Sequence, residues 1–297
     1  MSYHLKSIVL DCRRQVLMDD YEATINQAEG DHVCFERRYQ EWLRELDREG
    51  ITVLEQRKDE PCQAALYVVD DPAKARRHMD RQEPVMFLAC GDQGADLSGV
   101  KYVGMHLTEI PADYFDKIYR RHTGIPWDIL ETDRCWLRET TPADVDDFYR
   151  IYAEPSVTAF MEDLYPDRER EIAYTQDYIK NVYELYGHGV WTVCLRETGE
   201  VIGRAGLSFR EGFENPELGF VIGVPWQGRG IATEVCKAVL DFGVSELDFS
   251  EVIAFVEPGN RVSRHLLHKL GFEEESETVL CGKKHICCKW HLFEEKK

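Results

Sequence analysis

The chain has 297 residues, of which 43% are hydrophobic and 31% charged, and its formal net charge is −19. This length suggests two domains of about 150 residues each, and the composition excludes a disordered protein. Nucleic acids and anionic membranes bind basic surfaces, so the negative charge argues against both as partners. The charge either steers an amine-bearing, cationic partner or merely serves solubility.

The chain shows no sign of export or membrane insertion. No stretch approaches the roughly 20 apolar residues of a membrane-spanning helix, and the residues after Met1 lack the layout of a signal peptide. The ten cysteines are scattered and include no Cys-x-x-Cys pair. We therefore expect a cytoplasmic protein with reduced thiols, without a disulfide framework or a bound metal.

Short apolar runs alternate with helical patterns over the first 130 residues. Strands are expected at residues 7–10, 51–54, 64–69, 84–89 and 101–105, and helices at 31–49, 72–81 and 111–122. This alternation predicts a small Rossmann-like α/β domain, residues 1–130, whose sheet is mostly parallel.

Gly124 and Pro126 interrupt the helical pattern and predict a domain boundary, with a second domain over residues 134–297. Strands are expected there at residues 135–138, 190–196, 201–210, 217–222, 252–256, 272–280 and 283–293, and helices at 168–186, 230–242 and 261–270. A further helix is expected to begin within residues 140–144, where a threonine cap precedes Pro142.

The most informative stretch runs from Glu217 to Thr233, where a strand leads through a short turn into a helix. Gly228 and Gly230 let the backbone turn tightly and approach a ligand closely. The unpaired N–H groups of the first helical turn point at one spot, so the sequence predicts a pyrophosphate cradle. The turn lacks both the Gly-Lys-Ser/Thr of a Walker loop and the Gly-x-Gly-x-x-Gly of a dinucleotide fingerprint.

This turn resembles the Gln/Arg-x-x-Gly-x-Gly/Ala motif with which the GNAT acyltransferase superfamily holds the pyrophosphate of acetyl-CoA. Residues 258–263 and the following helix, which runs into Leu270-Gly271-Phe272, resemble the family's second cofactor segment. Residues 137–144 are similar to the start of the RimJ/RimL-type branch, and the order of elements also agrees. The resemblance implies an acetyl-CoA-dependent N-acetyltransferase with a mixed, twisted β-sheet, splayed at the motif strand and flanked by helices.

The resemblance also implies roles for individual residues. The pantetheine arm and the thioester carbonyl would meet the backbone of Phe220, Val221 and Ile222. The pyrophosphate would be bound by Gln227, Gly228, Arg229, Gly230, Ile231, Ala232 and Thr233. Asn260 would contact the pantetheine arm, with Ser263 near the cofactor.

The acid–base residues are less clear than the cofactor residues. Glu217 lies where some family members have a general-base glutamate, although a solvated strand-end carboxylate is the alternative. Leu267 occupies the position of the family's tyrosine acid, so the general acid is unassigned and the thiolate would be protonated by water. His265 and His268 share the same helix, where a histidine is more often structural than catalytic.

The acceptor pocket is expected from residues 153–174 and the edge of the last two strands. Acids that either bind a cationic amine or are merely solvated are Glu154, Glu162, Asp163 and Asp167. Phe160, Tyr165 and Tyr174 are expected in the core or the pocket wall, and Trp226 against the cofactor turn. A small amine, a polyamine and a peptide or protein N-terminus all remain open as acceptors, as does a homodimer. A non-catalytic acyl-CoA sensor is the alternative function.

The first domain carries weaker signals. Residues 7–11 faintly resemble the first strand of a haloacid-dehalogenase-type phosphatase, but Asp11 is followed by Cys12-Arg13 rather than by the second acid of Asp-x-Asp. Asp70 and Asp71 follow a buried run and suggest either a receiver-like phospho-acceptor or a helix cap. Residues 91–95 follow a strand without a phosphate-loop pattern. A degenerate module for stability, dimerisation or regulation is the preferred interpretation, with an active phosphohydrolase as the competitor.

Overall fold

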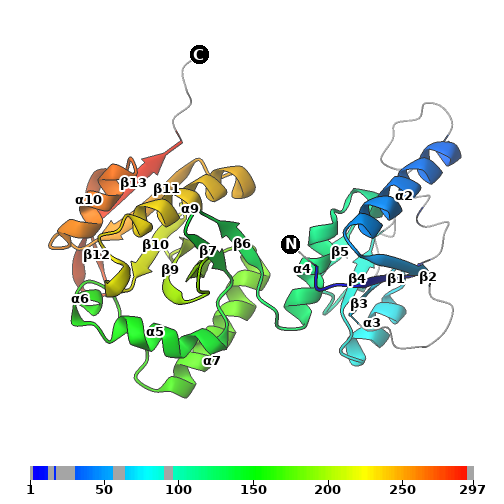
Figure 1. Cartoon of the computed structure of the whole chain (residues 1–297), viewed down its shortest axis with the longest axis horizontal. Coiled ribbons are helices and arrows are strands. Elements are labelled where there is room, and N and C mark those ends of the chain that lie inside the picture. Colours follow the sequence, from blue (N-terminus) through cyan, green and yellow to red (C-terminus); the bar gives the residue numbers. More distant parts are fainter. Residues whose placement is uncertain (1–2, 13–16, 18–30, 56–63, 90–95, 293–297) are drawn as a thin grey trace, which may run out of the picture. The chain divides into compact units, whose positions relative to one another are not determined.

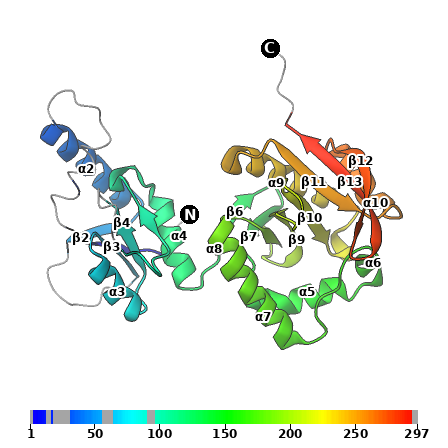
Figure 2. The same ribbon diagram turned by 180° about the vertical axis from the view of Figure 1, so that it is seen from behind.

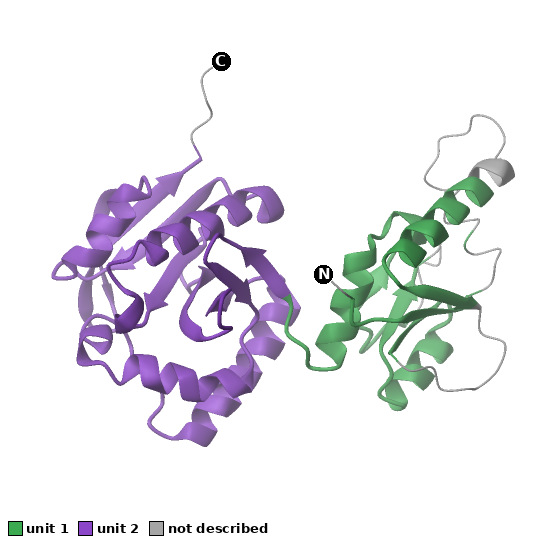
Figure 3. Ribbon diagram, viewed as in Figure 1, with its two compact units in different colours: residues 1–127 green, residues 128–297 purple. Residues whose placement is uncertain are grey.

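The computed structural model describes residues 3–12, 17, 31–55, 64–89 and 96–292. Contacts divide the chain into two compact units, residues 1–127 and 128–297 (Figure 3). Within the described ranges, no helix has both the length and the apolar character needed to cross a membrane. Each unit has its own sheet.

The first unit is a parallel sheet with helices packed on it (Figure 1). Its elements are β1 (Ser7–Asp11), α2 (Asp31–Arg48), β2 (Thr52–Glu55), β3 (Ala65–Val69), α3 (Pro72–Asp80), β4 (Val85–Leu88), β5 (Val103–Gly104), η1 (Leu107–Glu109) and α4 (Ala112–His122). The strand order is β2-β1-β3-β4-β5, and the neighbouring strands pair in parallel. The predicted Rossmann-like fold is confirmed.

Strand β3 shows how this sheet is covered on both faces. Leu66 lies in one core cluster with Trp42 of α2 and Phe115 of α4. Tyr67 lies in another with Ala75 of α3. Because successive side chains of a strand point to opposite faces, α2 and α4 cover one face and α3 covers the other. This explains why the strand sequences are apolar throughout rather than alternating.

The second unit is built on an eight-stranded sheet of mixed direction. Its elements are β6 (Asp128–Glu131), β7 (Cys135–Arg138), η2 (Pro142–Asp144), α5 (Val145–Tyr152), α6 (Pro155–Thr158), α7 (Arg168–Tyr178), η3 (Ile179–Tyr183), α8 (Glu184–Tyr186), β8 (Val190–Leu195), β9 (Val201–Ser208), β10 (Glu217–Ile222), η4 (Val224–Trp226), α9 (Ile231–Leu247), β11 (Glu251–Val256), α10 (Arg261–Lys269), β12 (Glu273–Leu280) and β13 (Lys283–His291). The strand order is β12-β13-β11-β10-β9-β8-β7-β6. The described strands are antiparallel neighbours except β10 and β11, which are parallel.

The helices of the second unit lie on opposite faces of its sheet, with α9 on one side and α5 and α7 on the other (Figures 1 and 2). Strand β10 contributes side chains to the hydrophobic core on each face. On one face, Leu218 and Ile222 pack with Val235 of α9. Val221 packs with Phe148 of α5. The side-chain alternation of one strand therefore assigns each face to its helices.

Three elements of the second unit were missed by the sequence analysis. Strand β6 pairs antiparallel with β7, so the sheet begins at Asp128 rather than near residue 134. The short helix α6 has too few residues for a helical period to be visible. The helix expected over residues 168–186 contains a π-helical turn, η3, between α7 and α8.

The π-helical turn places two tyrosine hydroxyls against the backbone of Val190. Tyr178 and Tyr183 are five residues apart, which is the i→i+5 hydrogen-bond spacing of a π-helix. The hydroxyl of Tyr178 accepts from the Val190 N–H at 2.8 Å, and the hydroxyl of Tyr183 donates to the Val190 carbonyl at 2.5 Å. A Cβ at Gly189 would lie 2.7 Å from the Tyr178 hydroxyl oxygen, so only glycine fits there. The turn thus anchors the helix to the start of β8.

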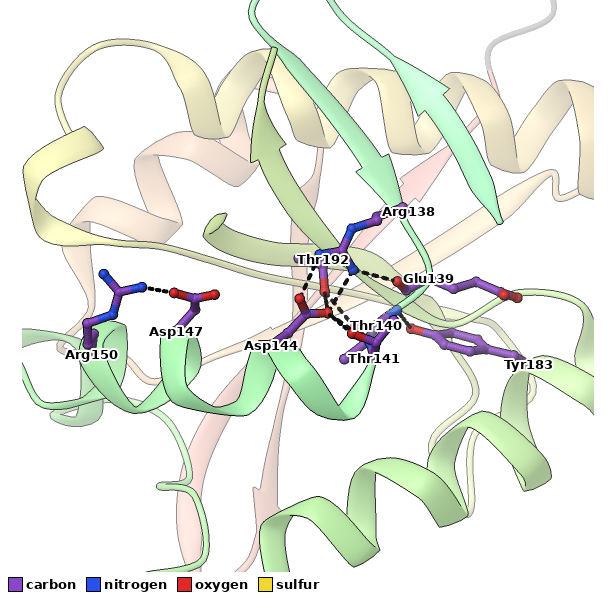
Figure 4. A network of polar contacts seen from close by, with 9 residues as sticks. All are labelled: Arg138, Glu139, Thr140, Thr141, Asp144, Asp147, Arg150, Tyr183 and Thr192. Carbon is purple, nitrogen blue, oxygen red and sulfur yellow. Dashed lines mark hydrogen bonds and ion pairs between the residues drawn. The ribbon is translucent and has the colours of Figure 1, made fainter. Parts of the chain in front are cut away.

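A buried carboxylate holds the start of α5 against the sheet (Figure 4). Asp144 is 3% exposed, and its two oxygens accept from the guanidinium of Arg138 at 2.6 and 2.7 Å. It also accepts from the Thr141 N–H at 2.7 Å and the Thr192 hydroxyl at 3.2 Å. The predicted Thr–Pro helix start is confirmed, with Thr141 as the cap.

Replacing Asp144 by alanine is expected to destabilise the protein strongly. The change leaves Arg138 buried without its partner, and breaking a buried ion pair costs about 3–5 kcal/mol. Asp146→Ala is the matched control, because Asp146 pairs with Arg168 at an exposed site where such pairs contribute about 0–1 kcal/mol. Denaturant unfolding of the full chain measures both variants. Equal losses of stability would contradict the anchoring role of Asp144.

Candidate active site

The sheet of the second unit opens between β10 and β11. These parallel strands share one register pair, Glu217 with Ile253, and the Ile253 N–H donates to the Pro216 carbonyl at 2.9 Å. In contrast, all of β10 from Glu217 to Ile222 pairs with β9 on its other side. Beyond Glu217, the edge of β10 that faces β11 is therefore unpaired in the ladder. The splayed sheet expected from the sequence is present.

The hydrogen-bond pattern shows which backbone groups face this opening. The Gly223 N–H donates to the Ile202 carbonyl of β9 at 2.8 Å. Hydrogen bonds alternate along an antiparallel pair, so the backbone of Val221 also faces β9. The backbone groups of Phe220 and Ile222 then face the opening. Of the three predicted residues, these two are the ones whose backbone can meet a ligand there.

The turn after β10 has the geometry of an anion cradle. Gly228 and Gly230 have φ of 71° and 78°, in the left-handed region that favours glycine. Gly230 caps α9 without a side-chain hydrogen bond, and the first intrahelical bond runs from the Glu234 N–H to the Gly230 carbonyl. The N–H groups of Ile231, Ala232 and Thr233 precede that bond and lie at the positive end of the helix dipole.

A distant arginine that the sequence analysis missed fixes this turn. Arg134 donates to the Arg229 carbonyl at 2.9 Å and pairs with Glu234 in the first turn of α9 at 2.6 Å. Burial acts to raise the pKa of Glu234, but hydrogen bonds from Thr132 and Arg134 bring that pKa below its ordinary value. The carboxylate is therefore ionised and neutralised locally by Arg134. Arg134 precedes the turn by about 95 residues, so no local pattern could reveal the contact.

Gln227 and Trp226 hold the other side of the turn. The Gln227 side-chain amide donates to the Ile222 carbonyl at 2.8 Å, which leaves the Ile222 N–H as the group facing the opening. The guanidinium of Arg229 lies 5.2 Å from the centre of the Trp226 ring. Trp226 thus packs against the turn, as expected. Gln227 supports the turn through this hydrogen bond from its side chain to the backbone of Ile222.

Asn260 begins α10 on the β11 side of the opening. Its Oδ1 accepts from the Ser263 N–H at 3.1 Å and caps the helix. The cap leaves both N–H groups of the Asn260 amide nitrogen available to donate to a ligand. Ser263 is partly buried in the first turn of α10.

The candidate base Glu217 is held in a two-point ion pair. Its carboxylate oxygens accept from Nε and Nη2 of Arg210 at 2.6 and 3.1 Å. Its side chain is 14% exposed, so it is not the freely solvated carboxylate of the alternative interpretation. Arg210 lies 5.7 Å from the centre of the Phe255 ring on β11, so this pair sits where β10 and β11 separate.

The loop between α6 and α7 borders the same opening. A Cβ at Gly259, next to Asn260, would lie 3.3 Å from the Phe160 ring. The Cys281 thiol, in the turn between β12 and β13, donates to the Glu162 carboxylate at 2.9 Å. That hydrogen bond and the charge of Glu162 raise the pKa of Cys281, so the thiol stays protonated. The loop therefore contacts both the connection that precedes α10 and the last hairpin.

Two of the other acids near this loop, Asp163 and Asp167, have structural partners. The Asp167 carboxylate caps α7 by accepting from the Glu169 N–H at 2.9 Å. Asp163 accepts from the Leu164 N–H at 2.8 Å. Glu154 precedes α6 as its N-cap residue without a side-chain cap. Among the four acids, Glu162 is the one that reaches across to the last hairpin.

Comparisons with known proteins agree with this geometry. The sequence model described as "Acetyltransferase (GNAT) domain" matches residues 134–273. The uncharacterized N-acetyltransferase p20 of Bacillus licheniformis is 30% identical over 151 residues, which make up 49% of this chain and 83% of that protein. The chain belongs to the GNAT family of N-acetyltransferases.

Two relatives of this GNAT protein have named acceptors. The [ribosomal protein uS5]-alanine N-acetyltransferase of Escherichia coli (strain K12) is 36% identical over 161 residues, 52% of this chain and 82% of the relative. The spermidine N(1)-acetyltransferase of the same organism is 30% identical over 132 residues, 44% of this chain and 63% of the relative. The acceptors in these names are an alanine of ribosomal protein uS5 and spermidine.

The GNAT unit departs from the family pattern on α10. Leu267, at the position of the family's tyrosine, is 2% exposed and lies in the core with Leu240 of α9. His265 and His268 are exposed on the same helix. A buried leucine cannot protonate the leaving thiolate. Within the part of the chain that the structure describes, no group of three or more His, Cys, Asp or Glu could hold a metal.

The first unit lies outside the family match. Asp11 at the end of β1 pairs with Lys74 at 2.9 Å, and Lys74 also lies 3.6 Å from Asp70. Asp71 caps α3 by accepting from the Ala73 N–H at 2.7 Å. Of the two interpretations of Asp70 and Asp71, this agrees with the helix cap. Residues 91–95 lie outside the described residues. No comparison supports the phosphatase resemblance.

Gly230→Asp is expected to weaken acetyl-CoA binding at least about tenfold relative to Gly230→Asn. Both side chains tolerate a positive φ and have the same shape, so they differ in the carboxylate placed at the cradle. A Cβ at Gly230 meets only Arg134, at 3.7 Å, so neither variant clashes with the core. Calorimetric titration with acetyl-CoA measures the difference. Equal affinities would contradict the cradle.

Proposed function

We propose that the second unit transfers the acetyl group of acetyl-CoA directly to a primary amine of a small molecule or of a peptide or protein N-terminus. The observation that carries the proposal is the opening between β10 and β11 next to the N-terminus of α9. It combines an unpaired strand edge with a turn suited to a pyrophosphate. Family membership supports acetyl-CoA as the acetyl donor.

The cofactor-binding assignment follows from this geometry. The N–H groups of Ile231, Ala232 and Thr233 would bind the pyrophosphate, supported by Gly228 and Gly230. The backbone of Phe220 and the N–H of Ile222 would bind the pantetheine arm and the thioester. Asn260 would donate from its amide nitrogen on the other side of the opening. Backbone donors fixed in a sheet stabilise a developing oxyanion without reorganisation.

The reaction needs one proton removed and one supplied. The free amine attacks the thioester carbonyl, the C–N bond forms, the C–S bond breaks, and CoA leaves as a thiolate. Glu217 would take the ammonium proton, directly or through water, with Arg210 holding the carboxylate in place. Because Leu267 replaces a tyrosine and has no ionisable group, the thiolate would take its proton from water.

An amine-dependent rate is the direct test of this function. Free thiol released from acetyl-CoA is measured with a panel of polyamines, amino acids and their amides, and short peptides. We expect one class to raise the rate well above hydrolysis, and mass spectrometry to find the acetyl group on its amine. Binding of acetyl-CoA without amine-dependent release across the panel would contradict the proposal and favour the acyl-CoA sensor.

Glu217→Gln is expected to lower turnover by about 10²–10⁴-fold, the usual contribution of a general base. The loss should be largest at low pH, because the free amine becomes rarer as pH falls below the amine pKa and the base is needed most there. Arg210→Met breaks the same ion pair but keeps the Glu217 carboxylate, so we expect it to lose less rate than Glu217→Gln. Rates and unfolding are measured for both across pH. Equal rate losses would remove Glu217 as the base.

A further inference from the structure

Arg204 lies one strand away from the cofactor opening. Its Cα is the register partner of Val221 on β10 and of Thr192 on β8. Residues opposite each other across a sheet point to the same face. The Arg204 side chain therefore shares the face on which Val221 packs with α5, not the face covered by α9.

Aromatic rings surround this arginine. Its guanidinium carbon lies 4.7 Å from the centre of the Phe148 ring. The charge of Arg204 acts to lower the pKa of four tyrosines: Tyr152, Tyr174, Tyr178 and Tyr183. Burial raises the pKa of Tyr152, and the charge of Arg204 opposes that rise. Neutral phenols can share hydrogen bonds with a guanidinium, but they do not neutralise it.

Arg204 lacks the carboxylate partner that Arg138 and Arg210 have. Arg138 and Arg210 each make a two-point contact with a carboxylate. None of the described carboxylates lies within ion-pair distance of Arg204, and its Nε is buried without a hydrogen-bond partner. The residue as a whole is only partly buried, so some of its surface remains accessible.

A buried guanidinium without a counter-ion is costly unless a ligand supplies the charge. Its planar fork matches a carboxylate at two points, and aromatic surroundings strengthen such a contact. We propose that Arg204 binds a carboxylate of the acyl acceptor, so that the acceptor class is an amine that also carries a carboxylate, as in an amino acid. This inference rests on the proposed amine acetylation.

The position of Arg204 favours the acceptor over the cofactor as the source of that carboxylate. The pyrophosphate cradle belongs to α9, which packs with Leu218 and Ile222 on one face of β10. Arg204 lies on the other face with α5. The loop after α6, which borders the opening, follows directly from that α5 layer.

The test compares amino acids with their amides as acceptors. For the wild type, we expect kcat/KM from thiol release to favour the acids by about 10- to 100-fold. Arg204→Met should remove this preference, and Arg204→Lys should keep part of it because an ammonium gives a single-point contact. Comparing variants by their acid-to-amide ratios cancels the different amine pKa values of the two acceptors. Arg196→Met, which removes an exposed arginine from the turn directly after β8, is the control.

A second readout does not depend on turnover. With free CoA present, the amino acid should raise the melting temperature of the wild type and of Arg196→Met more than its amide does, but not that of Arg204→Met. If Arg204→Met fails to fold, Arg204→Lys should bind acetyl-CoA normally while its preference for acids falls.

Two results would overturn the inference. One is a wild type that prefers amides, and the other is an Arg204 variant whose kcat/KM falls equally for acids and amides. Absent thiol release with every amine would instead overturn the proposed function, and the melting shifts would still decide the role of Arg204.

Discussion

Strands β10 and β11 run parallel but are joined in the ladder at one register pair, Glu217 with Ile253. Parallel strands normally continue their hydrogen bonds over several residues, so their separation leaves backbone donors and acceptors of Phe220 and Ile222 without strand partners. A sheet tolerates such an edge when a ligand or another segment takes its place. The cofactor assignment, the position of the candidate base and the place of the acceptor site all depend on this separation.

Ion pairs and hydrogen bonds stabilise the segments around the opening. Arg134 ties the cradle turn to α9, and Asp144 fixes α5 on the opposite face. Arg210 holds Glu217 where the two strands part. Each contact orients a group that would otherwise move, and preorganised polar groups are what an acyl-transfer site needs.

Features that depend on neighbouring residues were predictable from the sequence. The strands of the first unit, the Thr141–Pro142 helix start and the turn at Gly228 and Gly230 follow from local pattern and backbone freedom. Features that join distant segments were not. The Arg134 contact with the cradle turn spans about 95 residues.

The same limit applies to the remaining misses. Strand β6 is short and partly exposed, so its pattern does not distinguish it from a linker. The π-helical turn is accompanied by two hydrogen bonds with Val190, in which the Tyr178 hydroxyl accepts and the Tyr183 hydroxyl donates. No helical periodicity encodes them. The ion pair of Glu217 was also invisible, because Arg210 lies in the connection between two strands whose register only the fold defines.

Calorimetric titration of the full chain with acetyl-CoA, with free CoA and NADH as controls, tests the central claim most directly. The opening and its cradle predict that both CoA species bind and that NADH does not, because the turn lacks a dinucleotide fingerprint. The account would be contradicted if acetyl-CoA or free CoA does not bind, provided that circular dichroism shows the protein to be folded.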